Sequence, residues 1–436
     1  MLLQTNRRAS SIAPRSATAG KVALGAVAAA WAIGLAFILA HRIYVTNDSL
    51  SNYIHVWYIS ERFWHGQGIP LHMPVLGHGQ AYAFPYGFIP WLSAAFLRPL
   101  LGDWIVTLWL AVGALGIIAT QWWAFPELRG AWWTALLLAN PMLVEGPLLG
   151  QLPFIWSVAM LFAAIALWRR DRWLAAGVLL GLAQATHPAV MLPIAGPLVV
   201  ARLIWEPRRA RLISYYALSL AIAAPAAWLV VASPSVGDNS IGTLVSNFLD
   251  TVSLRAIVVA APFIGLAVQR TRLARVPALI LIGLIALNII LVPIRKNQYA
   301  WTALTRSADT SLVAFTRSPE FRPGATYRIL RVADGKVGMY QLVQAGARLD
   351  SEPFPESIDR RSWPSTREYA AFLQQRGVDH VIIYTTYDRR YQTNEHALLR
   401  DLAAARIASG PPCASLTVST AEYDIFAVRP AACAPP

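Results

Sequence analysis

The feature that most constrains this chain is a series of apolar runs, most of them close to the length that crosses a lipid bilayer. The hydrocarbon core of a bilayer is about 30 Å thick, so a helix needs about twenty apolar residues to cross it. The first run extends from Val22 to Ala40. The sequence therefore predicts a polytopic α-helical membrane protein with about nine transmembrane helices. The later runs lie at residues 104–124, 131–149, 152–168, 173–186, 189–205, 213–232, 256–268 and 276–293.

The composition agrees with a membrane protein. Hydrophobic residues make up 56% of the chain and charged residues 14%, whereas about a quarter of the residues in soluble domains are charged. In a soluble protein, a formal net charge of +14 would indicate binding to nucleic acid. Here, however, the basic residues stand in short clusters between apolar runs, where they act as topology signals. We therefore expect no nucleic-acid partner. The first run is longer than a signal-peptide core, so we expect it to be retained.

The basic clusters decide how one ambiguous segment lies. Residues Phe84 to Gly102 are largely apolar, but they contain Pro85, Pro90 and Arg98. If this segment crosses the membrane, the later basic clusters fall on the side opposite the basic N-terminus. If it lies in the membrane interface, they fall on the same side, which is the arrangement that the positive-inside rule favours. These clusters are RRDR at 169–172, EPRRAR at 206–211 and QRTRLAR at 269–275.

The resulting topology divides the chain into parts. Residues 1–21 form a cytoplasmic tail, residues 22–293 a transmembrane module, and residues 294–436 a small soluble α/β domain outside the cytoplasm. Within the module, residues 41–103 form one large external loop. The basic, Ala- and Arg-rich composition indicates a bacterial inner membrane, with the N-terminus in the cytoplasm.

The C-terminal part alternates between strand and helix patterns. Its strand candidates are rich in β-branched and aromatic residues. The first of its helix candidates has Ser365 as N-cap and Gly377 as its C-terminal stop. The strands are expected at 326–334 and 378–386, and the helices at 365–377 and 393–406.

Both cysteines of the chain lie in this C-terminal domain. Cys413 and Cys433 bracket two further strand candidates, SLTVS and YDIFAVRP. Because disulfides form in oxidising compartments and this domain is expected outside the cytoplasm, we predict a bridge between the two. A pair of separate thiols is the alternative.

Polar and titratable residues from separate parts of the chain gather on the predicted external face. Such groups are costly at membrane depth unless they face a cavity or one another. We therefore predict a polar cavity that opens to the outside. Its candidate residues are Asp48, Asn52 and His55 in the external loop, Glu145 and Gln151 at the end of the third run, His187 at an external turn, and Arg295 and Lys296 just past the last run.

Several stretches together resemble one superfamily. They are TNDSL just beyond the first run, WHGQGIP and GHGQAYAFPYGFIPWLSAAFLRPLLGD in the loop, the stretch from NPMLVEGPLLGQLP to ATHP, and FLQQRGVDHVIIY with YDIFAV in the tail. This order resembles the GT-C superfamily of polytopic glycosyltransferases and a group of uncharacterised bacterial membrane proteins similar to it. The resemblance implies transfer of a hexose or pentose from a polyprenyl-phosphate donor to a lipid, glycan or protein outside the cytoplasm. The chain departs from the common pattern at Asn47, Leu152 and His187, where an acid, Asn and Lys are frequent.

Inverting sugar transfer requires a carboxylate that takes the proton from the acceptor hydroxyl. Asp48 is our candidate for this base, since it is the first polar acid at the mouth of the predicted cavity. Its alternative role is the N-cap of a helix. Glu145 is the candidate second carboxylate, with an exposed loop acid as the alternative.

The departing phosphate requires cationic or hydrogen-bonding groups. His187, Arg295 and Lys296 are our candidates, and Gln151 is a candidate donor contact. Basic residues that merely anchor a span by snorkelling are the alternative for the pair 295–296. Four tryptophans near the external face are typical of an interfacial aromatic belt, with stacking on a sugar ring as the alternative. They are Trp57, Trp64, Trp91 and Trp104.

Asn52 and His55 follow Asp48 by four and seven residues, so on a helix the three share one face. There they would orient one another or the acceptor. They would also offer ligands to a divalent cation, but one carboxylate and one imidazole are few ligands, and we predict no firm metal site or cofactor.

A different class of protein also fits nine spans and an external cavity. A transporter or flippase of a lipid-linked sugar is the first alternative, although the chain shows no convincing internal repeat. A non-catalytic scaffold of the GT-C type is the second. Loss of activity in a folded Asp48→Asn variant separates the enzyme from both alternatives.

Overall fold

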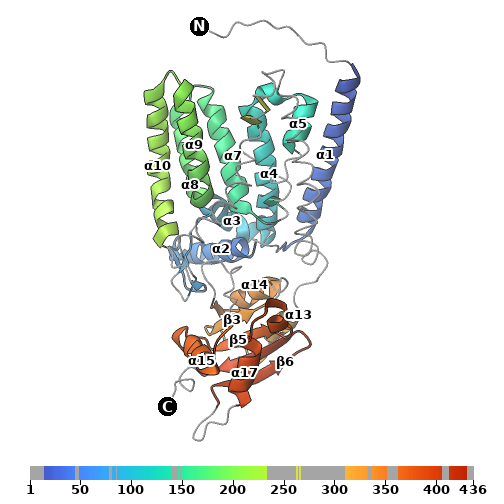
Figure 1. Cartoon of the computed structure of the whole chain (residues 1–436), viewed down its shortest axis with the longest axis vertical. Helices are drawn as coiled ribbons and strands as arrows, with labels where there is room; N and C mark the ends of the chain where they lie inside the picture. The colour runs from blue at the N-terminus through green and yellow to red at the C-terminus, as the bar shows by residue number, and fades with distance from the viewer. Residues whose placement is uncertain are drawn as a thin grey trace.

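A computed structural model describes residues 14–44, 49–77, 81–84, 86–138, 146–147, 149–232, 262–263, 265–266, 310–331, 336–350, 362–404 and 412–429. The described chain forms a bundle of apolar helices with an α/β domain at one end (Figure 1).

The bundle consists of helices that run along a common direction (Figure 1). By length and composition, the segments Gly20–Ala40, Trp104–Ala124 and Arg209–Leu229 suffice to cross a membrane, and α7, α8 and α9 are apolar but shorter. A helical membrane fold is therefore supported, whereas the number of nine spans is not confirmed. The predicted spans 256–268 and 276–293 fall outside the described residues, except for 262–263 and 265–266. The bundle helices are α1 (Pro14–Ala40), α4 (Trp104–Ala124), α5 (Ala131–Leu138), α7 (Leu152–Trp168), α8 (Trp173–Thr186), α9 (Pro188–Trp205) and α10 (Arg209–Ala232), and the short η3 (Pro126–Leu128) links α4 and α5.

Basic turns lie at the end of the bundle that is remote from the α/β domain (Figure 1). Arg208 and Arg211, at the start of α10, both donate to Oδ1 of Asp171 in the α7–α8 turn, at 2.6 and 2.9 Å. Helix α1 also begins at this end (Figure 1). The basic clusters at 169–172 and 206–211 thus lie on one side, as predicted, while the cluster at 269–275 falls outside the described residues.

The opposite end carries α2 (Ser49–Arg62) and α3 (Phe88–Leu101), which lie side by side beneath the bundle (Figure 1). Helix α3 has 14 residues, which gives a length of about 21 Å. This is shorter than a hydrocarbon core of about 30 Å, but α8 of the bundle also has 14 residues, so length does not separate α3 from the bundle helices. The interfacial position of this segment stays a prediction. Between the two helices lie the π-helical turn η1 (Phe63–Gln67) and the antiparallel pair β1 (His72–Met73) and β2 (Ala81–Tyr82).

The α/β domain is built on a five-stranded sheet with the order β4-β3-β5-β7-β6. β3 pairs parallel with β4 and β5, and β7 pairs antiparallel with β5 and β6. The strands are β3 (Thr326–Leu330), β4 (Arg348–Leu349), β5 (His380–Tyr384), β6 (Ala414–Ser419) and β7 (Tyr423–Val428), and the helices are α13 (Thr310–Phe315), α14 (Lys336–Gln344), α15 (Thr366–Gln375), α16 (Tyr387–Tyr391) and α17 (Glu395–Ala404).

The predicted elements of this domain are confirmed. Ser365 caps α15, because its Oγ accepts a hydrogen bond from the backbone N of Glu368 at 3.2 Å. Gly377 follows α15 with a φ of 58°, a left-handed conformation that favours glycine. The expected strands correspond to β3, β5, β6 and β7, and the second expected helix corresponds to α17.

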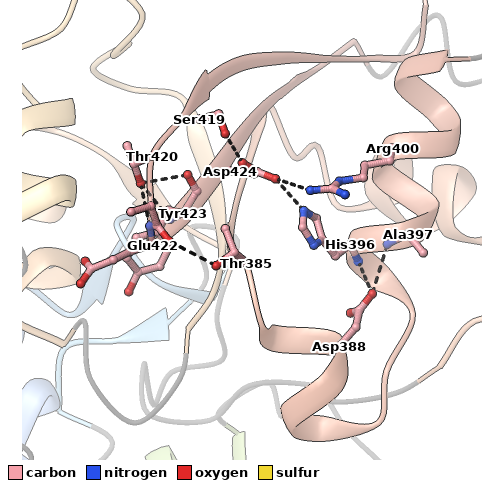
Figure 2. Close-up of polar contacts among 11 residues, drawn as sticks. Thr385, Asp388, His396, Ala397, Arg400, Ser419, Thr420, Glu422, Tyr423 and Asp424 are labelled. Carbon is pink, nitrogen blue, oxygen red and sulfur yellow. Dashed lines mark hydrogen bonds and ion pairs between the residues drawn. The ribbon is translucent and has the colours of Figure 1, made fainter.

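A buried carboxylate joins α17 to the β6–β7 hairpin (Figure 2). Asp424 lies 2.7 Å from His396 Nε2 and accepts hydrogen bonds from Arg400 at 3.1 Å and from Ser419 Oγ at 2.6 Å. Burial raises the pKa of Asp424, but these three hydrogen bonds outweigh it and hold the pKa below its usual value.

Cys413, the residue directly before β6, is buried and disulfide-bonded. Cys433 lies outside the described residues.

Candidate functional site

The Asn52 side chain connects three elements where α2 begins. Its Nδ2 donates to the carbonyl of Gly150 at 2.7 Å, and its Oδ1 accepts from Trp91 Nε1 at 2.8 Å. Asn52 and Trp91 are fully buried. Both ends of the amide are therefore engaged, and they tie α2 to α3 and to the turn before α7.

Gly150 allows this turn to approach α2 closely. Its φ is 71°, and a Cβ at this position would overlap the Cβ of Ser49. Any other residue would push the turn away from the first residue of α2. Since α2 begins at Ser49, Asp48 is the residue immediately before the helix. Asp48 itself lies outside the described residues.

His55 lies one turn further along α2 and shares Trp91 with Asn52. Its ring stacks on Trp91 with a centroid distance of 4.1 Å and an interplanar angle of 17°. Its Nδ1 lies 2.9 Å from the carbonyl of Ala83. Because a carbonyl only accepts, this nitrogen carries the proton. Asn52 and His55 thus occupy one face of α2, as predicted, and both pack against α3.

The α8–α9 turn meets the start of α3 through aromatic contacts. The His187 ring stacks on Tyr86 at 5.5 Å and meets the edge of Phe154 at 6.3 Å. Tyr86 in turn lies 4.8 Å from Trp91. The rings form a continuous path from His187 to Trp91 and hence to Asn52 and His55.

Gly87 fixes the backbone in this region. Its N–H donates to the carbonyl of Thr186 at 2.7 Å, which joins the start of α3 to the end of α8. Its φ is 77°, and an added Cβ would lie 2.6 Å from the Trp91 ring. A side chain at this position would displace Trp91, so glycine is required here.

The structure thus brings together some of the predicted residues. Asn52, His55 and His187 lie on one connected set of contacts, and the buried Gln151 directly follows Gly150 in that set. The helices α2 and α3, which carry or contact these residues, lie at the end of the bundle that faces the α/β domain (Figure 1), and we call this set of contacts the layer. The remaining candidates, Asp48, Glu145, Arg295 and Lys296, lie outside the described residues.

Three residues of this layer were not predicted as site residues. Gly87 and Gly150 carry a local signal, since each stands in a proline-flanked turn (PYGFIP and GPLLGQLP). Trp91 was expected in an interfacial belt, and that interpretation is wrong. Its side chain is fully buried because its indole N–H binds Asn52 and its ring packs against His55.

The described part of the chain offers no cluster of metal ligands. Within it, no group of three or more His, Cys, Asp or Glu side chains is placed to hold an ion. Asn52 and His55 instead bind backbone carbonyls. The prediction of no firm metal site or cofactor stays untested.

The overall fold resembles that of one solved structure. The fold is similar to that in the crystal structure of ArnT from Cupriavidus metallidurans bound to undecaprenyl phosphate, with a TM-score of 0.52. The chain has the ArnT fold. The match covers 94% of this chain and 98% of the ArnT chain at 13% sequence identity. At this identity the similarity with ArnT establishes the fold alone. Comparisons with protein-family models and with curated protein sequences found no match.

Proposed function

We propose that this chain is a membrane glycosyltransferase that moves a monosaccharide from a polyprenyl-phosphate donor to a lipid, glycan or protein acceptor outside the cytoplasm. The observation that supports it is the fold shared with ArnT over 94% of the chain, because that ArnT structure holds undecaprenyl phosphate. In this proposal the lipid headgroup lies at the bundle end that carries α2 and α3.

In this proposal Asp48 is the general base of an inverting reaction. It takes the proton from the acceptor hydroxyl while the hydroxyl oxygen attacks the anomeric carbon. The bond between that carbon and the phosphate oxygen breaks, and polyprenyl phosphate leaves with the electron pair. His187, Arg295 and Lys296 stabilise the charge that develops on the phosphate. Glu145 assists as the second carboxylate.

In this proposal, described residues hold the His187 ring and the turn that follows Asp48. Asn52 and Gly150 fix the first turn of α2, which immediately follows Asp48. Tyr86 and Phe154 hold the His187 ring. Asn52 and His55 are therefore positioning residues in our proposal. Gln151 contacts the donor.

We also propose that the α/β domain lies outside the cytoplasm. The Arg-rich turns at 169–172 and 206–211 lie at the bundle end remote from that domain (Figure 1). Under the positive-inside rule, the basic end faces the cytoplasm, in this case of a bacterial inner membrane.

The test is transfer of radiolabelled sugar from a panel of polyprenyl-phosphate donors into membranes that contain the wild type or the Asp48→Asn variant. We expect transfer by the wild type and its loss in Asp48→Asn at equal abundance. Asp171→Asn is the matched control, since this acid lies at the far end of the bundle, where its Oδ1 accepts from Arg208 and Arg211. Equal transfer by Asp48→Asn and the wild type would remove Asp48 from catalysis, and absence of transfer with every donor would favour a carrier or a scaffold.

A further inference from the structure

Tyr340 of α14 lies at the contact between the α/β domain and the bundle. Its side chain is fully buried. Its hydroxyl donates to Oδ1 of Asp103 at 2.7 Å and accepts from Gln344 Nε2 at 2.9 Å. Burial raises the pKa of the Tyr340 phenol far above its usual value, and the charge of Asp103 raises it further. The phenol therefore remains a neutral donor at any working pH.

Asp103 joins Tyr340 to the two helices beneath the bundle. This carboxylate, which directly precedes α4, also accepts from Arg98 Nε of α3 at 3.0 Å. Arg98 donates in addition to Oε1 of Glu61, near the end of α2, at 2.8 Å. One polar network thus connects α14 of the α/β domain with α2, α3 and the start of α4.

The Tyr340 ring contacts α2 directly. It packs against Tyr53 with a centroid distance of 5.5 Å. Tyr53 is the neighbour of Asn52 in the chain, and its hydroxyl lies 3.1 Å from Thr107 Oγ1 of α4. The same hydroxyl accepts from the backbone N of Tyr44 at 2.8 Å, just before the segment that leads to α2. Tyr340 therefore contacts the first turn of α2 next to the residue that binds Gly150.

The domain contact is apolar as well as polar. A single hydrophobic core extends from α2 and α4 to α14 and one face of the sheet; it includes Leu50, Ile54, Met339 and Val343. Leu349 N of β4 donates to the carbonyl of Val75 in the external loop at 2.9 Å. Domains with small polar contacts move relative to one another, but an extensive hydrophobic contact restricts such motion.

We propose that the α/β domain completes the site by holding the first turn of α2 in place, with Tyr340 as the positioning residue. This inference rests on the proposed function, since the turn that Tyr340 holds directly follows the proposed base Asp48 in the sequence. A misplacement of about 1 Å in reacting groups lowers a rate by about a hundredfold. The domain is then required for the rate of transfer and not for recognition of the donor.

The first test is hydrogen exchange of the full-length protein in lipid nanodiscs. Tyr340→Phe keeps the ring and removes the bond to Asp103, and Tyr340→Ala removes both contacts. We expect exchange of the α2 amides (residues 49–62) to become about tenfold faster in Tyr340→Phe, as the loss of a buried hydrogen bond to a charged group implies. Exchange in α17 should stay unchanged, which shows that the domain remains folded.

Tyr327→Phe is the matched control. It removes a tyrosine hydroxyl that accepts from the backbone N of Arg322 at 2.9 Å and donates to the Arg322 carbonyl at 3.2 Å, both within the same domain. We expect wild-type exchange in α2 for this variant. Unchanged α2 exchange in both Tyr340 variants, or equally fast exchange in Tyr327→Phe, would overturn the inference.

The second test is kinetic and separates this inference from the proposed function. With a donor that the wild type uses, Tyr340→Phe should lower kcat about tenfold, with an unchanged KM for the donor. A rise in KM with unchanged kcat would instead assign the domain to donor binding and contradict the proposal. If the wild type transfers no sugar, the proposed function and the effect of Tyr340 on transfer both fail, while hydrogen exchange still decides whether Tyr340 holds α2.

Discussion

A methyl group added at Gly150 should disable the site while it leaves the rest of the fold in place. In Gly150→Ala the new Cβ overlaps the Cβ of Ser49, and the residue must keep a φ of 71°. The left-handed conformation costs about 1–2 kcal/mol for alanine. Overpacking of a buried contact costs about 1–3 kcal/mol. The sum is ~2–5 kcal/mol if the native backbone is retained.

The chain can relieve this cost only by separating the turn from α2. That separation breaks the bond of 2.7 Å between Asn52 Nδ2 and the Gly150 carbonyl. It also moves the first turn of α2 and with it the attachment point of Asp48. We therefore expect transfer activity to fall about a hundredfold, as for other misplaced catalytic groups, together with a lower Tm.

Two other glycine positions serve as controls for backbone strain and for an ordinary side-chain contact. Gly324→Ala keeps a φ of 83° but has no atom within 4 Å of the added Cβ, so it reports backbone strain alone. Gly116→Ala lies in α4, where the added Cβ meets Ala159 Cβ at an ordinary 3.6 Å. The assays are sugar transfer per folded protein and thermal unfolding in detergent. Wild-type transfer and wild-type Tm in Gly150→Ala would refute the close approach between this turn and α2.

Two further predictions follow from the described contacts. Asn52→Leu removes the side-chain partner of the Gly150 carbonyl and of the Trp91 indole N–H, at a cost of about 1–3 kcal/mol for each buried group. We expect a lower Tm and loss of transfer. An unchanged Tm would contradict the role of Asn52 in joining α2 to α3 and to the Gly150 turn. The second prediction concerns Asp424, whose pKa in the folded state lies below the ordinary value of 3.8. The unfolded state therefore binds the proton more readily than the folded state. The stability that this carboxylate supplies above pH 3.8 is lost as the pH falls through its folded pKa. Acid unfolding of the α/β domain, followed by tryptophan fluorescence, should show this loss in the wild type and not in Asp424→Asn, and identical acid profiles would refute it.

The elements that could be predicted from the sequence are those whose signals are local. Ser365 and Gly377 mark the ends of α15 within a few residues of the helix that they terminate. Asn52 and His55 share a face of α2 because helical periodicity alone places them there. The basic turns could be grouped on one side because their charges alternate with apolar runs.

The contacts that build the site could not be predicted in this way. Asn52 and Trp91 lie 39 residues apart, Asn52 and Gly150 lie 98 apart, and Asp103 and Tyr340 lie 237 apart. No periodic pattern reports which of several tryptophans is buried against α2. The predicted external loop is rich in aromatic residues throughout its sequence, so the sequence alone could not distinguish the buried Trp91 from an exposed tryptophan such as Trp64.

The most direct test of the central claim is the fate of a donor labelled in both its sugar and its lipid, with the purified protein in liposomes and an acceptor extract outside. The proposed function predicts that the sugar label moves to the acceptor and that an equal amount of free polyprenyl phosphate appears. Both products should be lost in Asp48→Asn. If the sugar label crosses the bilayer while it remains attached to the polyprenyl phosphate, the protein is a carrier and the account is contradicted.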